Sequence, residues 1–174
     1  KTQYIYNIIT QGRAYFLSRP RRFGKSLLVS TLKSYFLGEK ALFKGLYLEH
    51  AEPELAAEEG REAWQEYPVL YLALNEERYA SEFELNNTLN VALTEWEKRY
   101  GAESAEQTYP SRFRGVIQRA YEKMGRQVVV LIDEYDKPLL DTLHRPELHQ
   151  TCKEILHGFY SVLKGNSDYL RFVF

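Results

Sequence analysis

The sequence predicts an α/β fold in which helices cover both faces of a mainly parallel sheet, forming a three-layer sandwich. Short apolar runs that resemble strands alternate with longer segments whose apolar residues recur at helical spacing, and this alternation is typical of α/β domains. The run 128–132 contains only Val, Leu and Ile, a composition typical of parallel strands that are buried on both faces. Four strands are expected, near Tyr15, Leu70, Val130 and Phe172.

The helices are placed by their apolar stripes and their end signals. Four helices are expected, over residues 25–37, from a capping box at Ser81 to residue 100, from about 110 to 124, and from 146 to 165. Glycines mark their ends: Gly38, Gly101, Gly125 and Gly165. The acidic stretch 49–66 is expected to be a solvated, partly helical excursion that Trp64 attaches to the core.

Length and charge limit the class of protein. A chain of 174 residues can form one hydrophobic core without metal or disulfide support, so we expect a single domain over 1–174. The net charge of −1 gives no global field that would attract nucleic acid or an anionic membrane. Cys152 is the single cysteine, and no apolar run approaches the ~20 residues of a membrane span. A cytoplasmic location is expected.

Both ends of the sequence predict that it is a piece of a longer protein. The chain begins at Lys1 rather than Met, and it ends in the apolar run 170–174. We therefore expect a fragment that is truncated after the fourth core strand.

The residues from Phe23 to Ser26 lie between the first expected strand and the first expected helix. A phosphate-binding loop at this place needs inward N–H groups, a helix N-terminus aimed at the anion, a lysine between two phosphates and a hydroxyl for Mg²⁺. Gly24, Lys25 and Ser26 supply these in the required order. The full pattern G-x-x-x-x-G-K-[ST] is not met, because Arg19 stands where the first glycine belongs.

An acidic pair, Asp133 and Glu134, directly follows the strand expected at 128–132. Taken alone, such a pair is usually a helix cap or a turn. At the carboxyl end of a strand, however, a carboxylate can reach the hydration shell of Mg²⁺. We expect Ser26 and Asp133 to hold the metal and Glu134 to polarise a water for attack on the γ-phosphate. The expected catalytic residues are Glu134 and Lys25.

Two long segments, 16–26 and 131–138, resemble the AAA-ATPase-like family of prokaryotic P-loop NTPases, and the shorter segments 1–6 and 42–47 also fit that family. The resemblance covers essentially all 174 residues, and in the family an arginine at the position of Arg19 looks normal. It implies a P-loop fold with ATP as the ligand. It also implies, in many members, a restriction-endonuclease-like nuclease domain C-terminal to this one in the full-length chain.

The chain has one dense basic cluster beside the loop, formed by Arg13, Arg19, Arg21 and Arg22. Three interpretations of this cluster stay open: contact with a triphosphate, contact with a DNA backbone, and a solvated loop. The residues expected to contact the nucleotide are Arg21, Arg22, Phe23, Gly24, Lys25, Ser26 and Leu27.

Together these motifs predict Mg²⁺-dependent ATP binding with slow hydrolysis, in a regulatory or motor module of a larger protein. The alternative is a non-hydrolysing nucleotide- or DNA-contacting interaction module with a degenerate phosphate loop. No Asn/Thr-Lys-x-Asp guanine-binding motif occurs, which disfavours a GTPase. Because Glu134 directly follows Asp133, we expect the strand at 169–174 to lie between the loop strand and the acidic strand.

Overall fold

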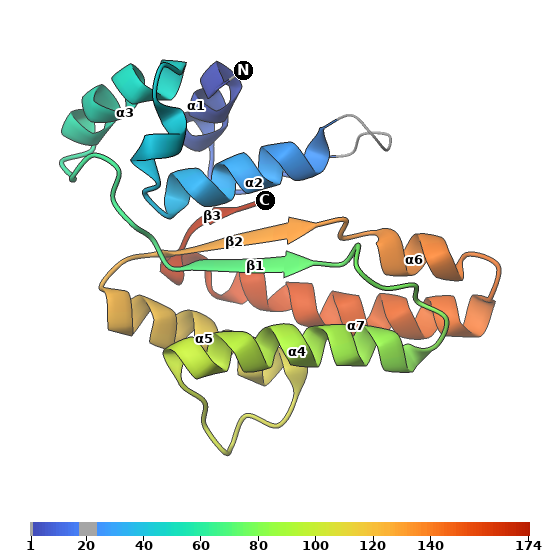
Figure 1. The fold of residues 1–174 in the computed structure, drawn as a ribbon. Helices are drawn as coiled ribbons and strands as arrows, with labels where there is room; N and C mark the ends of the chain where they lie inside the picture. The colour runs from blue at the N-terminus through green and yellow to red at the C-terminus, as the bar shows by residue number, and fades with distance from the viewer. Residues whose placement is uncertain (1, 18–23) are drawn as a thin grey trace.

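A parallel sheet of three strands lies at the centre of the computed structural model, which describes residues 2–17 and 24–174 (Figure 1). The elements in chain order are α1 (Thr2–Gln11), α2 (Lys25–Phe36), η1 (Lys40–Phe43), α3 (Tyr47–Glu58), β1 (Val69–Ala73), α4 (Glu82–Tyr100), α5 (Tyr109–Met124), β2 (Val128–Asp133), α6 (Lys137–Thr142), α7 (Pro146–Gly165), η2 (Ser167–Tyr169) and β3 (Leu170–Val173). The predicted α/β class and parallel sheet are confirmed.

The strand that carries the acidic pair is the central one, because the strand order is β1-β2-β3. β1 pairs with β2 in continuous register from Val69↔Val129 to Ala73↔Asp133. The pairing of β2 with β3 contains an irregularity between Val128 and Val129. β1 therefore accompanies β2 as far as the acidic residue at its end.

The fourth expected strand, near Tyr15, is not a strand in the described residues. Ala14 forms one isolated parallel bridge to Val173. The bridge consists of hydrogen bonds from Tyr15 N to Val173 O (2.9 Å) and from Val173 N to Arg13 O (2.8 Å). Among the described residues, Val173 is the one residue of β3 that bridges this segment, so no ladder forms. The prediction that the strand at 169–174 lies between this segment and the acidic strand is confirmed.

Alternate side chains of β2 enter two different hydrophobic cores, one on each face of the sheet. Val128 and Val130 belong to the core under α4, α5 and α7, whereas Val129 and Leu131 belong to the core under α1, α2 and α3. This division follows from the two-residue period of a strand. All four side chains are buried, as the unbroken apolar run predicts, and helices cover both faces of the sheet (Figure 1).

The four predicted helices are confirmed as α2, α4, α5 and α7. Ser81 caps α4, since its hydroxyl accepts a hydrogen bond from Phe83 N while Glu84 accepts one from Ser81 N. Gly125 ends α5 in the left-handed conformation. The sequence did not predict α1 or α6. α1 buries only three residues, and α6 has six residues in all, so neither offers a clear helical period.

The acidic stretch 49–66 has a buried side that was not predicted. The Glu52 carboxylate is 1% exposed and accepts hydrogen bonds from the Tyr35 hydroxyl and from Arg61 Nη1, both at 2.6 Å. Trp64 N donates a third, at 3.0 Å. Burial raises the pKa of Tyr35, and the neighbouring Glu52 raises it further, so this hydroxyl remains a donor. The expectation of a solvated excursion is wrong at Glu52, because these bonds join α3 to α2.

Trp64 attaches the stretch to the core as predicted. Its ring lies 5.1 Å from the Phe43 ring, measured between centroids, and it packs against the core on the α2 side of the sheet. The main chain of Trp64 also approaches the turn that follows α2. There Gly38 has a φ of +71°, and a Cβ on Gly38 would lie 2.5 Å from the Trp64 carbonyl oxygen.

We expect Gly38→Ala to destabilise the protein through this close approach. Gly45 is a matched control, because its φ is +74° and nothing lies within 4 Å of its Cβ position. Gly45→Ala should cost about 1 kcal/mol from the left-handed backbone alone. Gly38→Ala should lower the free energy of unfolding by roughly 1–3 kcal/mol more. Urea denaturation measures both variants, and equal losses would contradict the close packing.

Candidate functional site

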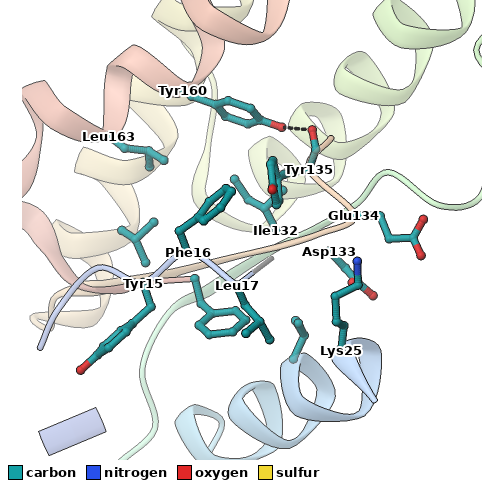
Figure 2. Close-up of a pocket in the computed structure, with 13 residues that line it drawn as sticks. Tyr15, Phe16, Leu17, Lys25, Ile132, Asp133, Glu134, Tyr135, Tyr160 and Leu163 are labelled. Carbon is teal, nitrogen blue, oxygen red and sulfur yellow. Dashed lines mark hydrogen bonds between the residues drawn. The ribbon is translucent and has the colours of Figure 1, made fainter. Parts of the chain in front are cut away.

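A cavity of about 240 Å³ opens at the carboxyl end of the parallel strands, where ligands bind in open α/β sheets. Its charged residues are Lys25 at the start of α2, Asp133 at the end of β2, and Glu134 (Figure 2). The rest of the lining is apolar or aromatic: Tyr15, Phe16, Leu17, Val29, Ile132, Tyr135, Tyr160, Leu163, Val173 and Phe174. The fold thus brings Lys25 and the acidic pair, which are far apart in the sequence, to one cavity.

The first turn of α2 has the geometry of an anion-binding helix start. Gly24, at the N-cap, is in the left-handed conformation with φ 75°. Because glycine offers no side chain to cap the helix, it leaves the first N–H groups available to solvent or to a ligand. Lys25 is half-buried and points toward Asp133 (Figure 2). Ser26 and Leu27 are exposed on the same turn, outside the cavity lining.

Asp133 holds a buried carboxylate oxygen without a partner. The residue is 2% exposed, and its Oδ2 accepts no hydrogen bond from residues 2–17 or 24–174. Its main-chain oxygen is engaged in the sheet, where it accepts from Leu74 N at 3.0 Å. Buried polar atoms without a partner are rare and costly. Carboxylate oxygens are the ligands that Mg²⁺ prefers, so the donor set at this position fits the expected metal.

Glu134 has an unusual backbone conformation for its residue type. Its φ is +52°, in the left-handed region that residues with a Cβ seldom occupy. Its carbonyl oxygen accepts a hydrogen bond from Lys137 N at 2.9 Å, which closes the turn into α6. Such conformations cluster at functional sites and persist where the surroundings enforce them. Phe16, Tyr135 and Tyr160 form the aromatic wall of the cavity. The turn directs the Glu134 side chain away from this wall (Figure 2).

The aromatic wall of the cavity was not predicted as part of the site. The Tyr160 hydroxyl, on α7, donates to the main-chain oxygen of Tyr135 at 3.3 Å. Burial raises the pKa of both Tyr160 and Tyr135, so both phenols are neutral at physiological pH. The available signal was the position of Tyr135, directly after the acidic pair.

Lys137 does not join the cavity lining. Its ammonium pairs with the Asp141 carboxylate at 2.6 Å and donates to Glu77 O at 2.7 Å. Cys152 is fully buried in the core under α4, α5 and α7.

Several predicted residues lie outside the part of the chain that the structure describes: Arg19, Arg21, Arg22 and Phe23. Their expected contacts with a triphosphate stay predictions. Within residues 2–17 and 24–174, no group of three or more His, Cys, Asp or Glu side chains is arranged to hold a metal ion. In the same ranges, no helix combines the length and the apolar composition needed to cross a membrane.

A lysine at a helix start and an acidic pair at the end of a parallel strand are typical of phosphate-binding α/β proteins. The chain belongs to the family described as predicted AAA-ATPase, whose model matches residues 1–174. It is 37% identical over 173 residues to a protein of Azotobacter chroococcum mcd 1 named "Uncharacterized protein in vnfD 5'region". That alignment covers 99% of this chain but 32% of the relative, so the chain spans about a third of the relative's length. No solved structure matches the chain.

We expect Asp133→Asn to stabilise the protein when metal and nucleotide are absent. The substitution keeps the shape of the side chain and removes the buried charge of a carboxylate whose Oδ2 has no partner. The free energy of unfolding should rise by about 1–3 kcal/mol. Urea denaturation in the presence of a chelator measures it. Asp168→Asn, at an exposed aspartate, is the control and should change it by less than about 0.5 kcal/mol. A less stable Asp133→Asn variant would contradict the description of this carboxylate.

Proposed function

We propose that residues 1–174 form a P-loop NTPase domain that binds ATP together with Mg²⁺ and hydrolyses it slowly. One observation carries the proposal: Lys25 and the unpartnered carboxylate of Asp133 line the same cavity at the carboxyl end of the sheet. A basic amine and a carboxylate that line one cavity suit a triphosphate with its metal. The family, described as predicted AAA-ATPase, supports the same ligand.

The phosphates are assigned to the first turn of α2. Gly24 leaves the helix N-terminus uncapped, so its N–H groups and the helix dipole favour an anion there. Lys25 places a positive charge between this turn and the acidic pair. Arg21, Arg22, Phe23 and Leu27 complete the proposed phosphate-binding segment.

The metal is assigned to Ser26 and Asp133, with the Ser26 hydroxyl and the Asp133 carboxylate as ligands. The fit rests on the buried Oδ2 of Asp133, which a cation would partner. Bound Mg²⁺ would neutralise charge that develops on the transferred phosphoryl group. Asp133 is suited to this role because β1 and β3 hold β2 between them.

Glu134 is assigned as the residue that orients water and accepts its proton. It is half-exposed at the mouth of the cavity, one residue beyond the proposed metal ligand. Its left-handed φ of 52° turns it out of the strand direction that Asp133 follows. The two neighbouring acids can therefore serve different purposes, one holding the ion and the other holding water.

The topology supports the P-loop assignment. The segment that precedes Gly24 pairs with β3 through Ala14, and β3 separates it from β2, the acidic strand. A strand inserted at this place is what we expect of the P-loop subgroup in which a glutamate directly follows the metal-binding aspartate, as Glu134 follows Asp133.

We place this domain in the cytoplasm as a regulatory or motor module of a longer chain, with a nuclease-like domain C-terminal to it as the proposed partner. The relative from Azotobacter chroococcum, about three times as long as the matched region, is compatible with such a partner. The net charge of −1 gives no support to general nucleic-acid binding by this part of the chain.

The alternative, a non-hydrolysing interaction module with a degenerate phosphate loop, is less well supported. A module without metal chemistry would gain nothing from a carboxylate that is 2% exposed and lacks a partner at Oδ2. Natural cores rarely keep such a group unless it serves a function.

Lys25→Ala tests the phosphate site. We expect ATP affinity to fall about 10- to 100-fold, the effect of losing one charge-assisted hydrogen bond to phosphate. Titration of a fluorescent ATP analogue with and without Mg²⁺ measures it. Lys33→Ala is the control, since Lys33 lies later on α2 with its ammonium 4.7 Å from the Tyr71 ring centroid. Comparable affinity for wild type and Lys25→Ala would reject the site.

Glu134→Gln tests the proposed base. The variant should bind ATP as tightly as the wild type but hydrolyse it about 10²- to 10⁴-fold more slowly, because the amide cannot accept the proton from water. A phosphate-release assay at saturating ATP measures turnover. Glu122→Gln, at an exposed glutamate of α5, should leave it unchanged. A Glu134→Gln protein that turns over at the wild-type rate would rule out this assignment.

A further inference from the structure

An exposed aromatic ring touches the turn that carries Glu134. Phe16 is 71% exposed, yet its ring lies on the Tyr135 ring, with centroids 4.7 Å apart and planes inclined at 56°. Both rings line the cavity beside Lys25 and the acidic pair (Figure 2). Aromatic pairs at this separation stabilise each other beyond the area they bury.

Tyr135 is well placed to decide the conformation of Glu134. It is the next residue after the left-handed φ of 52° at Glu134, and a strained residue keeps its conformation only where its neighbours enforce it. Two hydrogen bonds act on this turn: Tyr160 Oη donates to Tyr135 O at 3.3 Å, and Lys137 N donates to Glu134 O at 2.9 Å. The bond from Tyr160 is long for a hydroxyl donor, and the ring of Phe16 contacts the same residue, Tyr135, as a further restraint on the turn.

The main chain next to Phe16 is hydrogen-bonded to the end of β3. Tyr15, directly before Phe16, donates its main-chain N–H to Val173 O at 2.9 Å. The same stretch of chain leads toward Gly24 and the start of α2. The contact between Phe16 and Tyr135 therefore links the segment before the phosphate-binding turn to the residue after the proposed base.

We propose that Phe16 and Tyr135 are positioning residues that hold Glu134 in its left-handed conformation. The inference rests on the proposed function for its catalytic consequence, but not for its structural one. The ring contact restrains the turn in the free protein, and it directs the Glu134 carboxylate toward the water that it orients during hydrolysis.

The first experiment compares Phe16→Leu with Phe83→Leu by amide hydrogen exchange in the nucleotide-free protein. Phe83 is the matched control, because it is 72% exposed, lies at the start of α4, and is among the exposed hydrophobic side chains. The reporter is the Lys137 amide, which is bonded to Glu134 O. Phe16→Leu should raise its exchange rate about 2- to 10-fold, which corresponds to the free energy of one aromatic contact. Phe83→Leu should leave it unchanged.

The second experiment measures ATP binding and turnover for the same variants. Phe16→Leu should lower kcat about 2- to 10-fold while the Kd of ATP stays within about twofold, because the contact acts on Glu134 rather than on the phosphates. Tyr135→Leu should have a similar effect, and the double variant should be no slower than the worse single variant. Each variant should remain folded and unfold in one cooperative urea transition, as Phe83→Leu does.

The outcomes separate this inference from the proposed function. An unchanged Lys137 amide in Phe16→Leu would overturn the inference, whatever the protein does with ATP. Weaker ATP binding at unchanged kcat would also overturn it, since Phe16 would then act on the ligand. A wild-type protein that fails to bind ATP would reject the proposed function, while the exchange result would still decide whether the contact restrains the turn.

Discussion

The burial of one carboxylate at the end of the central strand is the constraint on which the candidate site depends. β2 is covered on both faces by hydrophobic cores and flanked by two parallel strands. Asp133, at its end, is therefore only 2% exposed. Removing a carboxylate from water is unfavourable unless a partner compensates it. Only a well-packed fold can hold such a group, and the two cores supply the apolar burial that offsets it. Stability and site chemistry are therefore opposed at this residue.

The position of the Lys25 ammonium depends on how α2 packs against the rest of the protein. One side of α2 packs on the sheet through residues such as Leu32 and Phe36. Toward α3, the Tyr35 hydroxyl donates to the buried Glu52 carboxylate, which also accepts from Arg61. Breaking one member of a buried network leaves the others without partners. This network fixes α2 against α3, and through α2 it fixes the place where Lys25 meets the cavity.

The cavity combines a charged end with an apolar wall, and the combination matters for the chemistry. Charges interact more strongly where apolar side chains keep water away. The wall is drawn from α7, from the ends of β2 and β3, and from the segment around Phe16. Residues that look like ordinary packing in the sequence therefore shape the electrostatics of Lys25 and Asp133.

The sequence by itself determined the α/β class, four of the helices and the buried strand that ends at Asp133, because these depend on local periodicity, on capping at Ser81 and on the β-branched run before Asp133. Only the tertiary structure decided which side chains meet. The burial of Glu52 and the contact of Phe16 with Tyr135 join residues far apart in the chain. A local pattern cannot encode such contacts, since they depend on how whole elements dock across the sheet.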